Sequence, residues 1–229
     1  MLLLAGEDSG WNDLIRRATN AEVIVEWGRQ PSDADIQRLR ELAPDLGITA
    51  WWPYILKPEV FDIPRLGCLN FHPSLLPEGR GKHPNFWALK GRTPFGVTLH
   101  FIDEGIDTGD VAFQQEIPVF WEDTGETLHG KARATVVDLF KQHFHSILAG
   151  DLPRHAQDRS AGAFHRAREL EDASQIDLKR EYRAGELLDL LRARTYAAHP
   201  GAWFAEDGET YEVRIEIRKC ANNYRTNKL

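Results

Sequence analysis

The sequence predicts an α/β protein built on a doubly wound, Rossmann-like and mostly parallel sheet. Short apolar runs rich in β-branched residues alternate with segments of about 10–15 residues in which apolar side chains recur at helical spacing. Turn and capping residues separate these runs. A chain of 229 residues is long enough for one large domain of this class with a small appendage. It is too short for two full-sized domains.

The N-terminal third of the chain supplies the clearest alternation. Apolar runs predict three strands, at residues 1–5, 22–27 and 46–52. A helix is expected after a turn at residues 6–10, on the stripe Trp11, Leu14, Ile15 and Ala18. A second helix is expected after Ser32, because Asp35 follows three residues later as in a capping box, and it buries Ile36, Leu39 and Leu42. Strands that alternate with helices in this way pair in parallel.

Three further strands and two helices complete the main domain, which we place at residues 1–150. The strands are expected at residues 67–71, 96–102 and 111–119, and a short helix at residues 85–90. Residues 123–126 are typical of a cap for a long helix that runs to Gly150. Its apolar stripe consists of Leu128, Ala132, Val136, Leu139, Phe140, Phe144, Ile147 and Leu148.

Residues 151–229 are predicted to form a linker and a small C-terminal appendage of a helix and β structure. Residues 151–168 are polar and irregular, as in a linker or a wrapping loop. The later elements are expected at residues 184–194 (helix), 202–205 and 211–219 (β structure). Residues 222–229 have little to bury, so we expect them to be disordered. The apolar strands of this appendage suggest a homodimer.

Composition and charge disfavour several classes of function. The 28 Lys and Arg residues against 35 Asp and Glu residues give a formal net charge of −7, which disfavours nucleic acid as a partner. Cys68 and Cys220 lie far apart and no metal-ligand spacing is present, so we expect a reduced, cytoplasmic setting and no metal. The apolar run at residues 2–5 is too short for a signal peptide or a membrane span.

Two polar segments follow neighbouring elements of the predicted sheet. Asn70 and His72 lie at the end of the fourth strand, where open α/β sheets place ligands, and Pro73 and Pro77 stiffen the loop that follows. The acidic segment 103–110 follows the fifth strand, and its carboxylates come near His72 if the two strands are neighbours.

An amide, an imidazole and a carboxylate together suit acyl transfer. The amide of Asn70 can donate to a developing oxyanion, His72 can move the proton, and Asp107 can orient or tune the imidazole. His72 and the acidic segment 103–110 also have purely structural interpretations. A single His in such a loop is more often a structural hydrogen-bonding group than a catalyst, and an acidic turn such as residues 103–110 is usually an ordinary turn or a cation-binding loop.

Two sequence blocks resemble the signature of the 10-formyltetrahydrofolate-dependent formyltransferases. They are residues 69–77 (LNFHPSLLP) and residues 101–109 (FIDEGIDTG), supported by the flanking segments 79–81 and 96–98. The resemblance is close over residues 50–119 and only architectural before them. It implies that Asn70, His72 and Asp107 are catalytic, the same set that the residue chemistry selects.

The resemblance further implies 10-formyltetrahydrofolate as the co-substrate. Its pterin would lie against Tyr54, Ile55 and Leu56, and against the backbone of Ile102, Asp103 and Glu104. Trp51 and Trp52 depart from the small residues expected just before that loop. In the implied reaction an acceptor amine attacks the formyl carbon, Asn70 donates to the oxyanion, and neutral His72 accepts or relays the proton.

Members of this family differ in the amine that they formylate. Residues 6–10 (GEDSG) carry two acids where glycinamide ribonucleotide transformylases have a phosphate-binding loop. Residues 175–177 and 199–204 resemble methionyl-tRNA formyltransferase, but only 26 residues follow Trp203 and the chain is acidic. The pattern is most like the amino-sugar N-formyltransferases, which modify a nucleotide-linked sugar for surface polysaccharide.

A basic and aromatic segment after the first block fits that acceptor. Arg80 and Lys82 could bind a diphosphate and Trp87 a sugar, although Lys82 as a solvated charge and Trp87 as a buried residue are about as probable. Three other classes stay open: a formyltetrahydrofolate hydrolase, which would use the same three residues with water, a nucleotide-binding oxidoreductase, for which the Gly-rich signature is missing, and a catalytically inactive binding domain.

Overall fold

The computed structural model describes residues 2–5, 25–27 and 29–220. The helix expected around Trp11, Leu14, Ile15 and Ala18, the turn at residues 6–10 and the tail at residues 222–229 lie outside the described residues.

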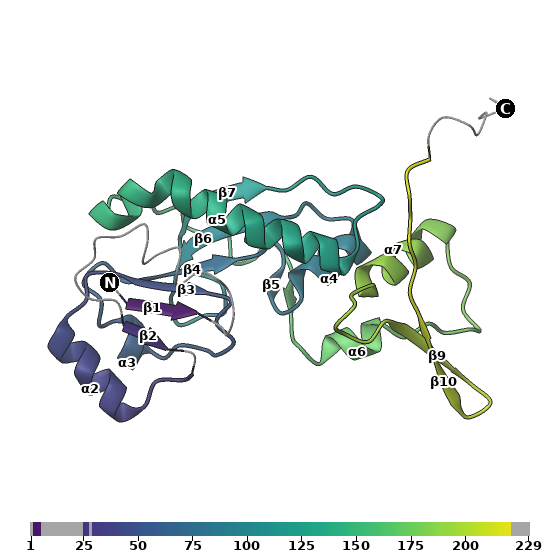
Figure 1. Cartoon of the computed structure of the whole chain (residues 1–229), viewed down its shortest axis with the longest axis horizontal. Helices are drawn as coiled ribbons and strands as arrows, with labels where there is room; N and C mark the ends of the chain where they lie inside the picture. Colours follow the sequence, from purple (N-terminus) through teal and green to yellow (C-terminus); the bar gives the residue numbers. More distant parts are fainter. Residues whose placement is uncertain (1, 6–24, 28, 221–229) are drawn as a thin grey trace.

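A six-stranded sheet in the order β2-β1-β3-β4-β6-β7 forms the centre of the molecule (Figure 1). Its strands are β1 (Leu2–Ala5), β2 (Val25–Trp27), β3 (Gly47–Ala50), β4 (Cys68–His72), β6 (Gly96–Phe101) and β7 (Val111–Glu116). The first four strands pair in parallel, and β6 runs antiparallel to both β4 and β7. The predicted fold class, α/β with a mostly parallel sheet, is confirmed.

The antiparallel pairing of β4 with β6 changes one expectation. Leu69 lies opposite Phe101 and His72 opposite Thr98, so the carboxyl end of β6 lies beside the amino end of β4. The two polar segments therefore do not follow adjacent strand ends, as the sequence had suggested. The connection between β4 and β6 contains the short strand β5 (Arg80–Gly81) and helix α4 (Pro84–Gly91).

The helices begin at the capping residues that the sequence indicates. Helix α2 (Asp33–Leu42) starts at Ser32 with a capping box to Asp35, and α5 (Gly125–Ala149) starts at Thr124 with a capping box to Thr127. Helix α5 ends at Gly150, which adopts the left-handed conformation at φ 69°. The short helix α3 (Pro58–Phe61) was not predicted.

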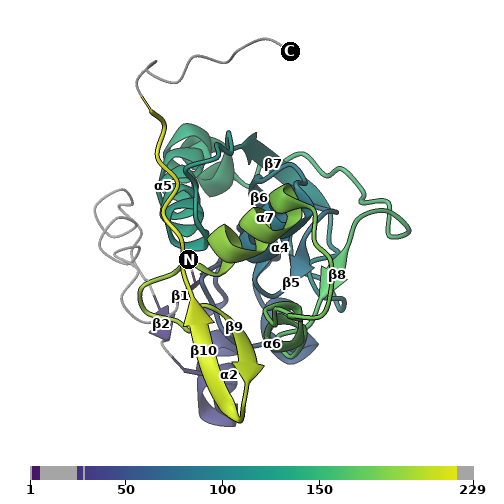
Figure 2. The ribbon, with the colours of Figure 1, turned by 90° about the vertical axis from the view of Figure 1, so that its right-hand side faces the viewer.

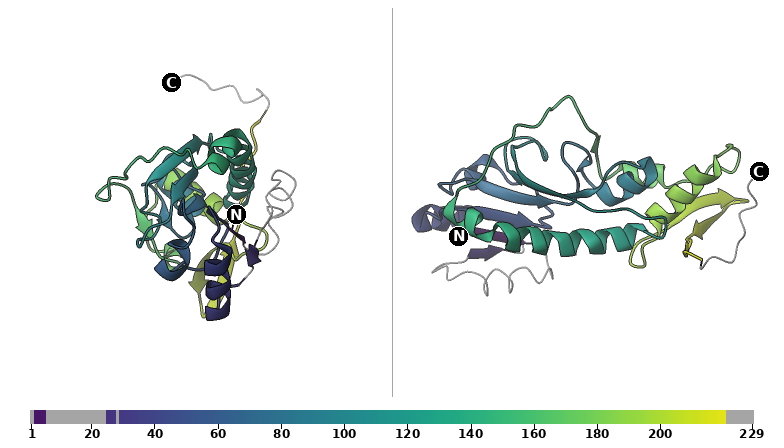
Figure 3. Two further views of the ribbon diagram at one scale, coloured as in Figure 1. Left: turned by 90° about the vertical axis from the view of Figure 1, so that its left-hand side faces the viewer. Right: turned by 90° about the horizontal axis from the view of Figure 1, so that it is seen from above.

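Helix α5 runs along the molecule and covers one face of the sheet (Figure 3). Its inner side chains are buried in a core shared with β3, β4, β6 and α4, namely Leu128, Ala132, Val136, Leu139, Phe140 and Ile147. A second cluster, with Leu39, Leu56, Val60, Phe61 and Cys68, lies under α2 and α3. Leu42 and Leu148 were expected in these cores but are exposed, because each lies in the last turn of its helix.

The C-terminal part of the chain packs on α4 at the end of the molecule away from α2 (Figures 1 and 2). It contains β8 (Phe164–His165), α6 (Glu169–Ala173), α7 (Ala184–Arg194), β9 (Ala202–Glu206) and β10 (Glu209–Val213). The buried carboxylate of Asp189 binds Arg92 of the α4 cap and Arg192, which joins α7 to the main core.

Several of the predicted strands are shorter than expected. The strand expected at residues 46–52 spans Gly47–Ala50, and the one expected at residues 96–102 ends at Phe101. The strand expected at residues 111–119 ends at Glu116, and the β structure expected at residues 211–219 ends at Val213. Strand β10 pairs with β9 alone, so no neighbour extends it further. Among the described residues, none of the helices is long and apolar enough to cross a membrane.

Candidate active site

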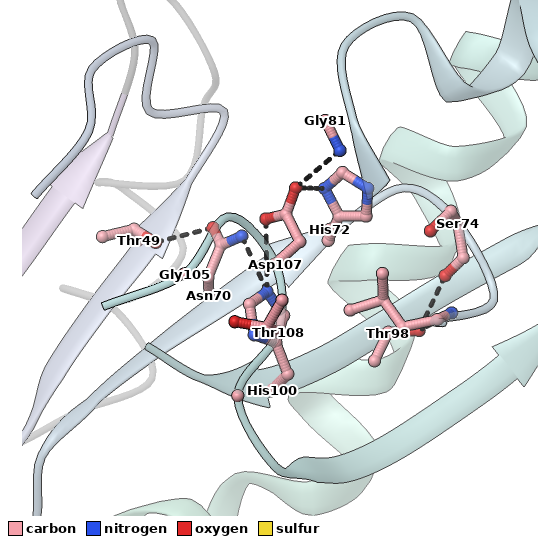
Figure 4. Close-up of polar contacts among 12 residues, drawn as sticks. Thr49, Asn70, His72, Ser74, Gly81, Thr98, His100, Gly105, Asp107 and Thr108 are labelled. Carbon is pink, nitrogen blue, oxygen red and sulfur yellow. Dashed lines mark hydrogen bonds and ion pairs between the residues drawn. The ribbon is translucent and has the colours of Figure 1, made fainter. Parts of the chain in front are cut away.

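A cavity of about 620 Å³ lies beside β4 and β6 and contains the residues that the sequence singled out for chemistry. Asn70 and His72 from β4, His100 from β6 and Asp107 from the loop after β6 all line it (Figure 4). Asn70 and His100 are directly opposed across the two strands, so their side chains share one face of the sheet. Asp107 reaches that face because the loop after β6 folds back over it.

The amide of Asn70 is fixed at both ends. Its Oδ1 accepts a hydrogen bond of 2.6 Å from the Thr49 hydroxyl, and its Nδ2 lies 3.1 Å from Nε2 of His100. Nδ1 of His100 lies 2.8 Å from the carbonyl of Phe101, so Nδ1 carries a proton and Nε2 accepts from the amide. Only one of the two amide protons of Asn70 is used in this way, which leaves the second for a ligand in the cavity.

The imidazole of His72 has its basic nitrogen directed at Asp107. Nε2 lies 2.8 Å from the carbonyl of Gly79 and therefore carries a proton, so Nδ1 is the atom that can accept one. Nδ1 lies 3.6 Å from Oδ2 of Asp107. Burial lowers the pKa of His72 below its usual 6.5, and the Asp107 charge only partly opposes this shift. His72 is therefore neutral and able to act as a base at neutral pH.

Asp107 is ionised, and its carboxylate accepts one backbone hydrogen bond and lies between the rings of His72 and His100. Its Oδ2 accepts from the backbone N–H of Gly81 at 2.9 Å, and its Oδ1 lies 3.6 Å from Nε2 of His100. Burial acts to raise the pKa of this carboxyl, but His72, His100 and the Gly81 N–H together outweigh it and hold the pKa well below its usual range. The residue adopts a left-handed conformation, φ 55°, which Asp tolerates better than most side chains.

The loop around Asp107 is organised by its own side chains and by a glycine. Asp103 accepts from the backbone N–H of Gly105 at 3.0 Å and from the Thr108 hydroxyl at 2.6 Å. A Cβ at Gly109 would lie 1.9 Å from the carbonyl oxygen of Phe101, so only glycine allows the loop to turn back so closely. These contacts place Asp107 over β4.

Most of the other residues singled out by the sequence also line the cavity. They are Tyr54, Ile55, Leu56, Ile102, Asp103 and Lys82. Three do not line it. Arg80 donates to the carbonyl of Ala161 at 3.0 Å, the ring of Trp87 stacks on His165 at 3.7 Å, and Glu104 is exposed. The binding roles of these residues stay predictions, and the last three would act from outside this cavity.

A cavity wall that the sequence did not suggest comes from the segment expected to be a linker. Phe164, His165, Arg166 and Ala167 line the cavity, and β8 pairs in parallel with β5. A Cβ at Gly81 would lie 2.2 Å from the carbonyl of His165, so a glycine is required for this approach. Only tertiary contacts bring residues 164–167 to the cavity. The sequence offers one local indication of a role for this segment, namely the aromatic pair Phe164 and His165 within a polar stretch.

His100, His83 and His129 also line the cavity and were not singled out. His100 could have been found only from the antiparallel register that sets it opposite Asn70. Trp51 and Trp52, which depart from the resemblance, both contribute to the wall. Their indole N–H groups are buried without a partner among the described residues, and Trp51 has φ 53°. Within the described part of the chain, no cluster of side chains is arranged to hold a metal ion.

Comparisons with known proteins show the family to which this chain belongs. The Formyl transferase family model matches residues 16–142, and a model of the N-formyltransferase dimerization C-terminal domain matches residues 169–219. A methionyl-tRNA formyltransferase of Syntrophus aciditrophicus is 34% identical over 183 residues, 79% of this chain and 56% of that protein. The chain thus spans about half the length of such curated relatives.

Solved structures show the same fold over three quarters of the chain or more. A sugar N-formyltransferase from a Shewanella species matches with a TM-score of 0.84 and 21% identity, covering 96% of this chain and 98% of that one. A formyltransferase from Anoxybacillus kamchatkensis, solved with UDP-4,6-dideoxy-4-formamido-L-AltNAc and tetrahydrofolate, matches with a TM-score of 0.66 and 26% identity, covering 75% of this chain and 88% of that one. The first family model alone covers more than half of the chain, and the protein belongs to the formyl transferase family.

Proposed function

We propose that this protein transfers a formyl group from 10-formyltetrahydrofolate to the amine of a nucleotide-linked amino sugar. The observation that carries formyl transfer is the convergence of Asn70, His72 and Asp107 in one cavity, with a free amide proton, a neutral imidazole and an ionised carboxylate. The reaction forms a bond between the acceptor nitrogen and the formyl carbon and breaks the bond from that carbon to the donor nitrogen. One proton leaves the acceptor amine and one is returned to the released nitrogen.

The three side chains divide this work. Asn70 directs its second amide proton at the oxygen on which negative charge develops, and Thr49 and His100 prevent the amide from turning away. Nδ1 of His72 takes the proton from the attacking amine. Asp107 lies 3.6 Å from Nδ1 and stabilises the imidazolium that results.

The cavity also suits the folate, which supplies the activated one-carbon group when bound. Tyr54, Ile55 and Ile106 are large apolar side chains that are exposed beside the cavity, as expected for a wall that an aromatic ring covers. The unpaired indole N–H groups of Trp51 and Trp52 add buried donors in the same wall. These residues would hold the pterin, together with Leu56 and Ile102.

Three observations support an amino sugar as the acceptor. Residues 169–219 match a domain model described for N-formyltransferases, and the Shewanella sugar N-formyltransferase shares the fold over nearly its whole length. The net charge of −7 opposes binding of a tRNA backbone. The domain match supports a homodimer, which we propose for this chain. We further propose that the enzyme acts in the cytoplasm, in the synthesis of surface polysaccharide.

A second candidate is formylation of methionyl-tRNA. The curated relatives of that name are 31–37% identical to this chain, which is higher than the identity to the Shewanella sugar enzyme. We rank it second because the chain is acidic. Hydrolysis of the formyl-folate would use the same three side chains with water as the acceptor.

The test is release of tetrahydrofolate from 10-formyltetrahydrofolate with several acceptors offered in parallel. These are dTDP-, UDP- and GDP-linked amino sugars, glycinamide ribonucleotide, charged initiator tRNA and water. We expect turnover with a nucleotide-linked amino sugar, lost in Asn70→Ala and in His72→Ala. Turnover with the tRNA alone would contradict the proposed acceptor, and inactivity with all acceptors would contradict formyl transfer.

A further inference from the structure

One buried threonine beside the site takes no part in the chemistry described above. Thr98 of β6 lies directly opposite His72 of β4 and opposite Gln114 of β7, so the three side chains share one face of the sheet. Thr98 is fully buried, whereas Gln114 lies on an edge strand and is exposed. A hydroxyl and an amide therefore lie next to the strand that carries the proposed base.

The Thr98 hydroxyl uses all of its hydrogen-bonding capacity on the loop after β4 and on Gln114. It donates to the backbone carbonyl of Ser74 at 2.7 Å and accepts from the backbone N–H of Leu76 at 3.1 Å (Figure 4). It also accepts from Nε2 of Gln114 at 2.8 Å, and the same nitrogen donates to the carbonyl of Leu76 at 2.8 Å. One hydroxyl group thus joins the backbone of residues 74–76 to strands β6 and β7.

The loop fixed in this way supplies the carbonyl group that contacts the His72 ring. The backbone N–H of Ser74 donates to the carbonyl of His72 at 2.9 Å. Gly79 has a left-handed φ of 70°, and a Cβ there would lie 3.1 Å from Cβ of Ser74, so the two residues pack closely. The Gly79 carbonyl lies 2.8 Å from Nε2 of His72. The position of that carbonyl therefore depends on the backbone at Ser74, which Thr98 holds.

Two acceptors compete for the single proton of the neutral His72 ring. The Gly79 carbonyl lies 2.8 Å from Nε2, and Oδ2 of the Asp107 carboxylate lies 3.6 Å from Nδ1. At equal distance the carboxylate would be the stronger acceptor, because it is charged. The proton stays on Nε2 because the carbonyl is at hydrogen-bonding distance and the carboxylate is not. A loop shift that withdraws the carbonyl would place the proton on Nδ1, the atom that must accept one in the reaction.

We infer that Thr98, supported by Gln114, is a positioning residue that sets the tautomer of His72 through the loop that carries Gly79. The inference deepens the proposed function and rests on it for the role of His72 as the base. Neither Thr98 nor Gln114 lines the cavity. Their substitution should therefore change the proton position on His72, and with it kcat, more than the KM of either substrate.

The experiment measures the tautomer and the reaction separately. The tautomer is determined from the nitrogen-15 chemical shifts of the ring nitrogens in the full chain labelled at histidine. The spectra are recorded at about pH 8, where an imidazole with a pKa of about 6.5 or lower is neutral. The signals of His72 are assigned by their loss in His72→Gln. Values of kcat and KM are measured with the nucleotide-linked amino sugar that the acceptor assay identifies.

The variants differ in the hydrogen bonds that they leave to the loop. Thr98→Val keeps the shape and removes the hydroxyl, and Thr98→Ser keeps the hydroxyl as the conservative rescue. Gln114→Leu removes two hydrogen bonds at the exposed edge of the sheet without opening the core. Its matched control is Gln115→Leu, the next residue of β7, which points to the other face and whose Oε1 has no hydrogen-bond partner among the described residues. Val136→Ala, in the core under α5, controls for a loss of stability alone.

We expect the parent chain to carry the proton on Nε2 of His72. Thr98→Val should move a large share of the ring to the Nδ1-protonated tautomer and lower kcat about tenfold or more, because it leaves buried backbone groups of the loop unpaired. Thr98→Ser should restore the parent tautomer and kcat. Gln114→Leu should cause a smaller shift in the same direction, since water can replace part of an exposed amide. Both controls should keep the parent tautomer and kcat.

Several outcomes would overturn the inference. One is a proton on Nδ1 of His72 in the parent chain. Another is a folded Thr98→Val chain with the parent tautomer, and a third is a tautomer shift that leaves kcat unchanged. A loss of kcat without a tautomer shift would also overturn it, because Thr98 would then act by another route. If Thr98→Val does not fold, an unchanged tautomer in Gln114→Leu overturns the inference instead.

The spectra separate this inference from the proposed function because they need no turnover. A tautomer that depends on Thr98, in a protein that formylates none of the acceptors offered, would uphold the positioning role and contradict the proposed function. Formylation of a nucleotide-linked amino sugar by a chain whose His72 tautomer none of the variants changes would do the reverse.

Discussion

Two walls of the same cavity differ in the contacts that hold them in place. The first wall lies within residues 70–83 and 102–107. The second consists of residues 164–167, which line the cavity, and of residues 155–163, which lead to them. In the first, short-range constraints dominate: Pro73 and Pro77 restrict the loop after β4, and Asp103 closes its own turn on Gly105 and Thr108. The second wall has little structure of its own and is held by contacts to the first.

The contacts of the second wall are few and specific. His155 forms a bridge with Val111, β8 pairs with β5, and Gln157 donates to the carbonyl oxygens of Asp107 at 3.0 Å and Gly109 at 2.6 Å. An ion pair joins Arg159 to Asp103 at 2.9 Å. The comparison teaches that a motif-rich segment can present catalytic groups while a polar segment far along the chain shapes the space around them. Substitutions should therefore have large effects in the first wall and graded effects in the second.

The largest effect is expected for Asn70→Ala. Removal of one oxyanion donor costs about 10²–10³ in rate, and here the amide is already oriented by Thr49 and His100. Steady-state kinetics should show the loss in kcat with the KM for the folate nearly unchanged. Thr49→Val, which leaves the amide present but frees its Oδ1, serves as the partial control. Equal losses in kcat for the two variants would show that orientation, rather than donation, is the essential property.

Asp107→Asn is expected to reduce kcat by about 10², because proton transfer by His72 loses the charge that stabilises its imidazolium form. The parent enzyme should lose activity as the pH falls through the pKa of His72, which burial lowers below 6.5. The Asp107 charge raises that pKa, so its removal should move the acid limb of kcat/KM to still lower pH. If the acid limb of kcat/KM does not move in Asp107→Asn, a group other than His72 is responsible for it.

A smaller effect is expected for Gln157→Leu in the second wall. The side chain spans the carbonyl oxygens of Asp107 and Gly109, and two neutral hydrogen bonds of about 1 kcal/mol each correspond to a loss of at most roughly thirtyfold. The change should appear mainly in kcat, since Asp107 is displaced rather than the ligand-binding groups. Gln157→Glu cannot donate these hydrogen bonds when it is ionised, so its kcat should be reduced as much as that of Gln157→Leu. Full activity in either variant would disprove the coupling between Gln157 and the position of Asp107.

The smallest effect is expected for Arg159→Ala. Its guanidinium is largely exposed, and exposed ion pairs contribute at most about 1 kcal/mol. Activity should change by about twofold or less, and less still in high salt. A loss as large as that of Gln157→Leu would mean that the ion pair, and not the hydrogen bonds, holds the second wall to the first.

Much of the fold could be read from the sequence because its signals are local. Ser32 with Asp35 and Thr124 with Gly125 mark helix starts, and the apolar runs at residues 46–52 and 67–71 mark strands of the sheet. The predictions that were wrong concern the ends of helices and strands, where burial and pairing depend on neighbouring elements. Leu42 and Leu148 follow the periodicity of their helices but reach past the core, and the β structure after Val213 has no neighbour to pair with.

The sequence by itself was enough to select the side chains that we propose to carry the chemistry. Asn70, His72 and Asp107 are the residue types that acyl transfer needs, and prolines and glycines around them fix the loops, so their selection required no knowledge of long-range contacts. The three do converge, although not at adjacent strand ends.

Only the tertiary structure decided how those side chains meet and what surrounds them. The antiparallel register of β4 and β6 sets His100 opposite Asn70, and the return of the chain at residues 155–167 brings residues 164–167 into the cavity wall. The same packing moves Arg80 and Trp87 out of the lining and brings His83 and His129 into it. Strand direction and long-range pairing depend on how separate elements bury their apolar faces together, which spacing within one segment does not encode.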